Sequence, residues 1–345
     1  MQRPVMHPTF GEQADTSKKK QPRKRFEWAK RAFRLFGRIL LAHPFGGGNR
    51  AQFRNEEGTR LSRFVRGLTY RLAFVPLILM LFLTALIFAA THPGRSNEGP
   101  DPSSFGVYYD PVNFISEDGA RLEGWLIPVL DAKRVLEEGD QLIGKKYPAV
   151  VLVHDFAGSR QQLLPLVNPL HKAGFVVLAI NLRGAASLSG QAQTFGIKEA
   201  LDVKAGVDML RRRAFVDEHR IAVVGIGTGA NAALIAGRDD AGIAALVLAA
   251  PVDGFDAAFA ERVGHDRRWL PALRPLIRWT FSAMYGVDAE ELNVAKFSRT
   301  LQSRPVLMTD GRHGLMENAS VRGMRQFLQK HVGDKAETTA SLPTK

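Results

Sequence analysis

Residues 72–90 (LAFVPLILMLFLTALIFAA) form an uncharged, almost wholly apolar run. Its length is close to the ~20 residues that an α-helix needs to cross the hydrocarbon of a bilayer. A helix buried in a soluble domain is rarely apolar on every face over this length, and a cleavable signal peptide has no basic leader of about 70 residues. The sequence therefore predicts a transmembrane helix over residues 72–91, and Pro76 near its start allows a kink.

Basic residues flank this run unevenly. Four arginines precede it within residues 60–71, whereas only Arg95 follows it closely. Because positively charged flanks stay on the cytoplasmic side of a membrane, we expect a cytoplasmic N-terminus and a C-terminal domain on the outer side.

The net charge of +13 is concentrated before the predicted membrane helix. Residues 1–71 hold 17 of the 47 Lys and Arg but only five of the 34 Asp and Glu, so the remainder of the chain carries +1. A nucleic-acid-binding domain is therefore not expected. Within this partly disordered basic segment, residues 26–41 (FEWAKRAFRLFGRILL) are typical of an amphipathic helix that contacts anionic lipid. A helix that packs on a protein partner is the alternative.

The remaining chain predicts one globular domain at residues 107–332, between a Pro-, Gly- and Ser-rich linker at 92–106 and a polar tail at 333–345. Residues 112–129 contain two strand-like runs joined by a Glu-Asp-Gly turn, which indicates a β-hairpin. The later apolar runs are continuous and alternate with amphipathic stretches, a pattern typical of parallel strands covered by helices on both faces. We expect an α/β fold with a mostly parallel, doubly wound sheet.

Five stretches of this domain, in order, are similar to those of a known superfamily. They are FISEDGARLEGWLIP, LVHDFAGSR, INLRGAASLSG, TFGIKEALDVKAGVDML and GIGTGA. Together they resemble the α/β-hydrolase superfamily, nearest to its bacterial serine peptidase and esterase-like members, over about 220 residues. The resemblance implies a small cap over the site at about residues 254–303, for which a helical pair simply packed on the sheet is the alternative.

In this superfamily a serine on a sharp strand-to-helix turn is the nucleophile, a histidine takes its proton and an acid orients the histidine. The turn pattern Gly-x-Ser-x-Gly falls on Gly225, Gly227 and Gly229, so Gly227 stands where the serine is expected. Thr228 is the neighbouring hydroxyl, but its β-branched side chain is stiff. We expect Thr228 to help cap the following helix.

The acid and the histidine implied by the resemblance are missing from their usual positions. The acid falls on Gly314, and Asp253 and Asp310 are weak substitutes that also fit loop positions. His313 and His331 are the weak candidates for the base, although a histidine at the end of a helix also suits the helix dipole. The last strand and its histidine loop are expected to be absent.

The stretch that resembles the oxyanion loop contains His154, Asp155 and Phe156, with Asp155 in place of the usual glycine. This substitution puts a carboxylate where negative charge develops during acyl transfer. The chain has no cysteine, which excludes disulfides and a thiol nucleophile. No His, Asp or Glu spacing predicts a metal site, and no cofactor is expected.

These observations favour a single-pass membrane protein with a catalytically impaired or inactive α/β-hydrolase-like domain, which serves as a binding or scaffold module. A protein partner or a small acyl or peptide ligand fits that role. The bacterial character of the motifs suggests the inner (cytoplasmic) membrane, with the domain on the periplasmic side. One alternative is a working esterase or peptidase with a non-standard nucleophile. Another makes the basic N-terminus the active part and the outer domain a sensor.

Overall fold

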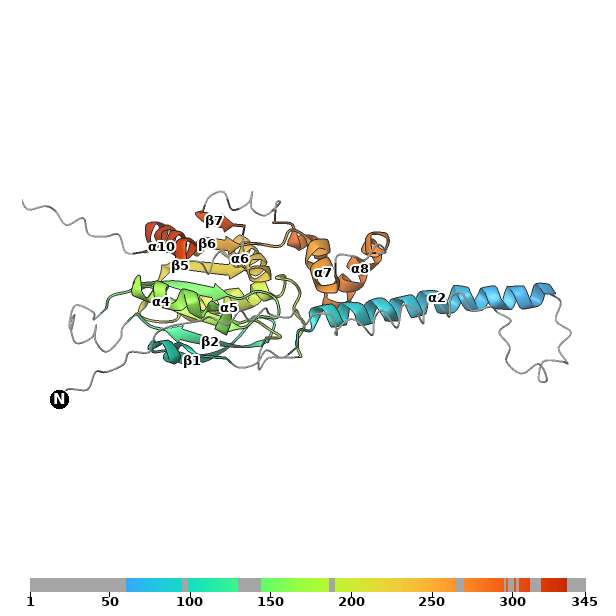
Figure 1. The fold of residues 1–345 in the computed structure, drawn as a ribbon, viewed down its shortest axis with the longest axis horizontal. Helices are drawn as coiled ribbons and strands as arrows, with labels where there is room; N and C mark the ends of the chain where they lie inside the picture. Colours follow the sequence, from blue (N-terminus) through green and yellow to red (C-terminus); the bar gives the residue numbers. More distant parts are fainter. Residues whose placement is uncertain are drawn as a thin grey trace, which may run out of the picture. The chain divides into compact units, whose positions relative to one another are not determined.

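The computed structural model describes residues 60–94, 99–129, 144–185, 190–264, 270–294, 296, 301, 304–310 and 318–333 (Figure 1). The chain divides into two compact units, Met1–Ile78 and Leu79–Lys345. The amphipathic helix predicted at residues 26–41 and the candidate base His313 lie outside the described residues.

The first unit contains the beginning of helix α2 (Arg60–Thr91), which includes Pro76. Along this helix the window Phe74–Thr91 has a mean hydropathy of 2.5. It is long and apolar enough to cross a membrane. In the first unit Leu72, Phe74 and Leu77 expose half or more of their surface.

The second unit is built on a seven-stranded sheet. Its strands are β1 (Asp110–Ile115), β2 (Arg121–Ile127), β3 (Tyr147–Val153), β4 (Val176–Asn181), β5 (Val216–Ile226), β6 (Ile243–Ala249) and β7 (Val306–Thr309). Their order is β1-β2-β4-β3-β5-β6-β7. β1 and β2 form an antiparallel hairpin, β2 pairs antiparallel with β4, and all later pairs are parallel. The predicted hairpin and mostly parallel sheet are confirmed.

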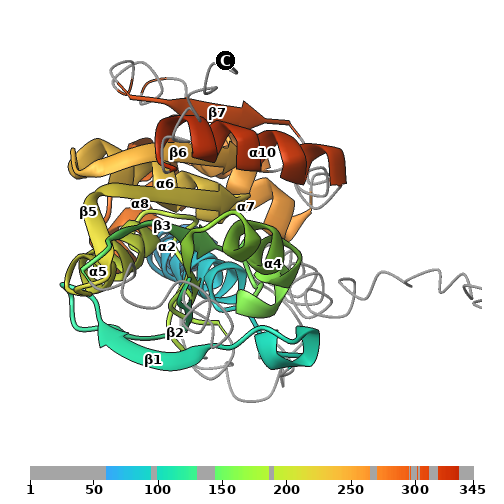
Figure 2. The same ribbon diagram turned by 90° about the vertical axis from the view of Figure 1, so that its left-hand side faces the viewer.

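Helices cover both faces of this sheet, which is why every residue of β3 and β4 is buried. On one face lie η3 (Arg160–Leu163), α4 (Leu164–Lys172) and α10 (Asn318–His331), which share a hydrophobic core with the central strands (Figure 2). On the other face lie α5 (Glu199–Arg211) and α6 (Thr228–Asp239), which contact each other. The short helix η1 (Pro102–Phe105) precedes β1.

A pair of helices follows β6 within the range predicted for a cap. These are α7 (Phe255–Val263) and α8 (Leu270–Tyr285), followed by η5 (Ala289–Leu292). Arg278 of α8 holds the two helices together, because its guanidinium donates to both carboxylate oxygens of Asp256 at 3.0 and 2.9 Å.

The last part of α2, Leu79–Thr91, belongs to the second unit and lies beside α8 (Figures 1 and 2). The Thr91 and Tyr285 hydroxyls are 2.6 Å apart, and the Gln193 N–H donates to the Thr91 carbonyl at 2.8 Å. The side chains of Leu83, Leu86 and Ile87 are completely buried. The end of the apolar helix is therefore packed against protein.

Candidate functional site

The turn between β5 and α6 has the geometry of a nucleophile elbow. Gly227 adopts φ 59° and ψ −121°, a conformation that costs a non-glycine residue about 1–3 kcal/mol. A Cβ on Gly225 would overlap the backbone of Gly229, and a Cβ on Gly229 would overlap the carbonyl of His154. The glycines on either side of Gly227 are thus required by the tight approach of β5, α6 and the loop after β3.

The carboxylate of Asp155, in the loop after β3, reaches the same point. Its Oδ1 atom accepts hydrogen bonds from the backbone N–H of Phe156 at 2.7 Å and of Thr228 at 2.8 Å. In α/β-hydrolases the oxyanion hole is made by the N–H of the residue after the nucleophile and by an N–H of this same loop. Both N–H groups therefore already have a carboxylate oxygen as acceptor.

Asp155 also fills the space beside Gly227. A Cβ built on Gly227 would overlap the Asp155 carboxylate, with its Oδ1, Cγ and Oδ2 atoms as the three nearest neighbours. A side chain at position 227 and the observed position of Asp155 are mutually exclusive. The observed position of Asp155 therefore depends on having a glycine at position 227.

His154 fixes the start of this loop. It is fully buried, and burial lowers its pKa to about 4, so the ring is neutral at pH 7. Its Nε2 atom accepts from the N–H of Leu182 at 3.0 Å, which leaves the proton on Nδ1 to donate to the Asp155 carbonyl at 2.7 Å. These two bonds engage both ring nitrogens, so the ring connects the loop after β3 to the end of β4.

Thr228 does not cap α6, and the expectation that it would was wrong. The N-cap residue is Gly227, which has no side chain, and the first N–H of the helix, that of Thr228, donates to Asp155 instead. Thr228 is the first residue of α6, and its Oγ1 lies 3.4 Å from Oδ1 of Asp155. This hydroxyl therefore faces a carboxylate, and no histidine among the described residues is hydrogen-bonded to it.

The structure does not bring the weak acid and base candidates together. Asp253 follows β6 and Asp310 follows β7, and both are exposed. His331 is exposed in the last turn of α10, where its ring lies 4.7 Å from that of Phe327. Figure 1 draws α10 at the end of the sheet opposite α7 and α8. Among the residues that the structure describes, no hydrogen bond or ion pair links these three.

Aromatic rings fill the region next to the oxyanion loop. Phe156 stacks on Phe195 with 5.5 Å between ring centroids, and Phe195 stacks in turn on Phe281 of α8 at 5.9 Å. Phe255 of α7 contacts both Phe195 and Phe281, at 5.9 and 4.6 Å. Phe195 is buried, and its φ of 61° is a conformation that is unusual for a non-glycine residue. We did not predict this cluster, because its members are spread over four segments of the chain.

A buried ionic network supports the neighbouring turn and was also missed from the sequence. Arg183 donates to Asp202 at 2.6 and 3.0 Å and to Asp118 at 2.6 and 3.0 Å. Although burial disfavours the charged guanidinium, these two carboxylates raise the pKa of Arg183 above its usual value. The same neighbours keep the turn after β4 in place. In the sequence, Arg183 belongs to the stretch INLRGAASLSG, which carries the resemblance but does not reveal the acidic partners of the arginine.

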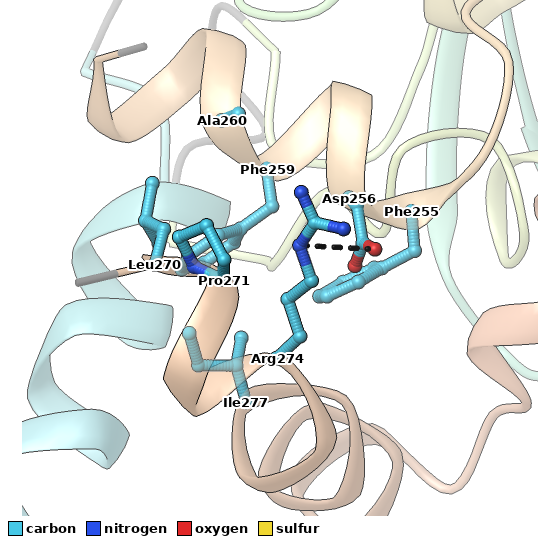
Figure 3. Close-up of a pocket in the computed structure, with 8 residues that line it drawn as sticks. All are labelled: Phe255, Asp256, Phe259, Ala260, Leu270, Pro271, Arg274 and Ile277. Carbon is cyan, nitrogen blue, oxygen red and sulfur yellow. Dashed lines mark ion pairs between the residues drawn. The ribbon is translucent and has the colours of Figure 1, made fainter. Parts of the chain in front are cut away.

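A cavity of about 190 Å³ lies between α7 and α8 (Figure 3). It is lined by Phe255, Asp256, Phe259, Ala260, Leu270, Pro271, Arg274 and Ile277. Its walls are mostly apolar, and the Nε atom of Arg274 lies 3.6 Å from the Asp256 carboxylate. Neither Asp155 nor the elbow lines this cavity. Within the described ranges, no group of three or more His, Asp or Glu is placed to hold a metal ion.

Comparison with solved structures tests the fold. An esterase of Pyrococcus furiosus superposes with a TM-score of 0.50 at 23% sequence identity, over 70% of this chain and 100% of the esterase. The chain has an α/β-hydrolase fold.

Curated proteins resemble parts of the chain, and one of them is named for an α/β-hydrolase domain, while no family model matches the chain. The uncharacterized protein YfhR of Escherichia coli K12 is 28% identical over 194 residues, which cover 55% of this chain and 60% of that protein. The α/β-hydrolase domain-containing protein WAV2 of Arabidopsis thaliana is 26% identical over 175 residues, 50% of this chain and 52% of WAV2. The hydrolase-fold chain thus spans just over half the length of these relatives.

Proposed function

We propose that this protein is a single-pass, membrane-anchored α/β-hydrolase-fold protein that has lost catalysis and serves as a binding or scaffold module. The observation that carries the proposal is the position of Asp155. Its carboxylate accepts from the N–H groups of Phe156 and Thr228 and fills the space that a side chain at Gly227 would need.

The chemical argument starts from what acyl transfer requires. A substrate carbonyl becomes an oxyanion as it is attacked, and the loss of a single oxyanion-hole donor costs about 10²–10³ in rate. Here both donors are bound to a carboxylate, whose negative charge would repel the oxyanion. Gly227 supplies no attacking atom, and the Thr228 hydroxyl has no histidine base among the described residues. The missing nucleophile, the missing histidine and the filled N–H groups all affect the same step, the attack on the substrate carbonyl.

Membrane anchoring is the second part of the proposal. The apolar window Phe74–Thr91 supports it, and the four arginines within residues 60–71 favour a cytoplasmic N-terminus. The hydrolase-fold domain would then lie outside. The similarity to proteins of Escherichia coli and Salmonella is in keeping with a bacterial protein. In a bacterium this orientation corresponds to the inner membrane and a periplasmic domain.

The cavity between α7 and α8 is the place where we expect a small ligand. At about 190 Å³ it is smaller than the roughly 300–1,000 Å³ of sites for drug-sized molecules. It therefore suits one acyl chain or a short apolar side chain. Arg278 already binds both oxygens of Asp256, so Arg274, in looser contact with that carboxylate, is the cation that can pair with an anionic ligand group.

The proposal is tested with the full-length protein in detergent micelles. The wild type, Gly227→Ser and the double variant Asp155→Ala/Gly227→Ser are assayed on short-chain aryl esters and aminoacyl arylamides, with an active esterase in the same micelles as control. We expect the wild type and Gly227→Ser to hydrolyse neither substrate. Gly227 has no attacking atom, and a serine at this position finds no histidine base among the described residues, even though its Cβ displaces the Asp155 carboxylate.

The competing hypothesis is a working esterase or peptidase with a non-standard nucleophile. It predicts turnover by the wild type that disappears in Thr228→Ala. That pair of results would overturn the loss of catalysis. Measurable hydrolysis by Gly227→Ser would show that a serine alone restores the site, and it would contradict the loss of the other catalytic groups.

A further inference from the structure

Helix α8 presents an uncharged, exposed face. Ala272, Pro275, Trp279 and Ala283 follow one another at intervals of three and four residues, so they lie on one side of the helix, and all four are exposed. The side chain of Trp279 is 60% exposed. The two arginines of the helix contact Asp256 of α7 and so lie on another face.

The neighbouring end of α2 has a similar character. Leu81 and Phe88 are 62% and 54% exposed, whereas Leu83, Leu86 and Ile87 on the other side of the helix are fully buried. Both α8 and this part of α2 belong to the second unit, and the Thr91–Tyr285 contact joins their ends. These two adjacent helices thus carry one part of the exposed apolar surface of the unit, separate from the exposed Phe105, Tyr108, Ile115 and Met308.

The length of the apolar run gives this surface a physical meaning. The last arginine before the run is Arg71, and the first fully buried residue is Leu83. Residues 72–82 rise only about 16 Å at ~1.5 Å per residue, roughly half of the ~30 Å hydrocarbon core. A complete span therefore needs residues 83–91 as well, and the protein that covers their buried side must enter the same depth of the membrane.

We propose that the exposed face of α8 is inserted into the phospholipid bilayer, on the side where the hydrolase-fold domain lies. Trp279 has an apolar ring and a polar N–H, the combination that favours the boundary between acyl chains and headgroups. Amphipathic helices in the plane of a membrane bury their apolar face by about 5–10 Å. The proposal rests on the membrane anchoring of the proposed function, and it makes the cap part of the membrane contact.

The natural absence of cysteine allows a direct test. Single cysteines are introduced in the full-length chain at Trp279 and Ala283, at Leu77 as a reference within the span, and at Arg322, an exposed residue of α10, as a reference in water. Each is labelled with a nitroxide in phosphatidylcholine nanodiscs. Electron paramagnetic resonance then compares collisions with oxygen, which concentrates in lipid, and with a water-soluble nickel chelate.

We expect the labels at 279 and 283 to resemble the label at 77, with an oxygen-to-nickel collision ratio at least fivefold higher than that at 322. If the label at 77 lies in lipid and those at 279 and 283 lie in water, the inference fails and the anchoring stands. If the label at 77 lies in water, the anchoring itself fails. Labels at 279 and 283 that neither reagent reaches would mean that protein covers α8, which also overturns the inference.

Discussion

The mutual exclusion of a side chain at Gly227 and the carboxylate of Asp155 predicts a large coupling between the two positions. In Gly227→Ala the φ of 59° costs about 1–3 kcal/mol. The new Cβ also displaces Asp155 from the N–H groups of Phe156 and Thr228, and hydrogen bonds to a charged group are worth about 1.5–3 kcal/mol each. We expect the variant to lose about 4–9 kcal/mol of its free energy of unfolding.

In the Asp155→Ala background the same substitution meets no carboxylate. Only the backbone cost of about 1–3 kcal/mol remains, so the two substitutions should be coupled by about 3–6 kcal/mol, the free energy of the two hydrogen bonds. Gly323→Ala is the matched control, because a Cβ at this position of α10 meets nothing within 4 Å. Its effect should be the same with and without Asp155.

The measurement is urea unfolding of the full-length chain in detergent micelles, followed by tryptophan fluorescence. Trp125 lies buried in β2 and reports on the hydrolase-fold domain. A coupling below about 0.5 kcal/mol, the level at which independent sites add, would refute the reasoning. It would mean that Asp155 does not occupy the space beside Gly227.

Three further outcomes follow from the structure. The pKa of about 4 for buried His154 lies below the ordinary 6.5 of the unfolded chain, so the unfolded state binds this proton first. The contribution of His154 to stability should therefore fall by about 3 kcal/mol as the pH drops from 6.5 to 4, and the difference between the wild type and His154→Gln in urea titrations should show it. Arg183→Ala leaves Asp202 buried without its partner and should cost about 3–5 kcal/mol in the same assay, whereas a loss below 1 kcal/mol would contradict a buried ion pair. For the α7–α8 cavity, we expect calorimetry to show that octanoate binds Arg274→Gln about tenfold more weakly than it binds the wild type. Octanoate should not bind Ala260→Leu, because the larger side chain fills the cavity. Octanol that binds the wild type as tightly as octanoate would disprove recognition of the anion.

The architecture of the sheet was predictable because its determinants are local. Continuous apolar runs such as residues 147–153 mark strands buried on both faces, and the Glu-Asp-Gly turn marks the hairpin that opens the sheet. Each of these signals lies within one element, so no knowledge of distant residues is needed. The elbow was found in the same way, from the spacing of its glycines.

The state of the site was predictable only in part. The sequence presents Asp155 and Gly227 as two separate departures from a motif, 72 positions apart. Only the fold reveals that one carboxylate fills the space left by the other residue's missing side chain. The role expected for Thr228 was wrong for a related reason, since Gly227 already occupies the N-cap position. Hydropathy likewise cannot distinguish lipid from protein as the neighbour of Leu83 and Ile87.

The binding of the Asp155 carboxylate to the N–H groups of Phe156 and Thr228 has a consequence for any molecule that enters from solution. A hydrolase that cleaves an ester or a peptide releases a carboxylic acid, and that product has the same functional group as Asp155. The aspartate is tethered by its own backbone, so it competes at an effective concentration that a dissolved carboxylate does not approach. In chemical terms the domain resembles an enzyme–product complex in which the product is encoded in the chain.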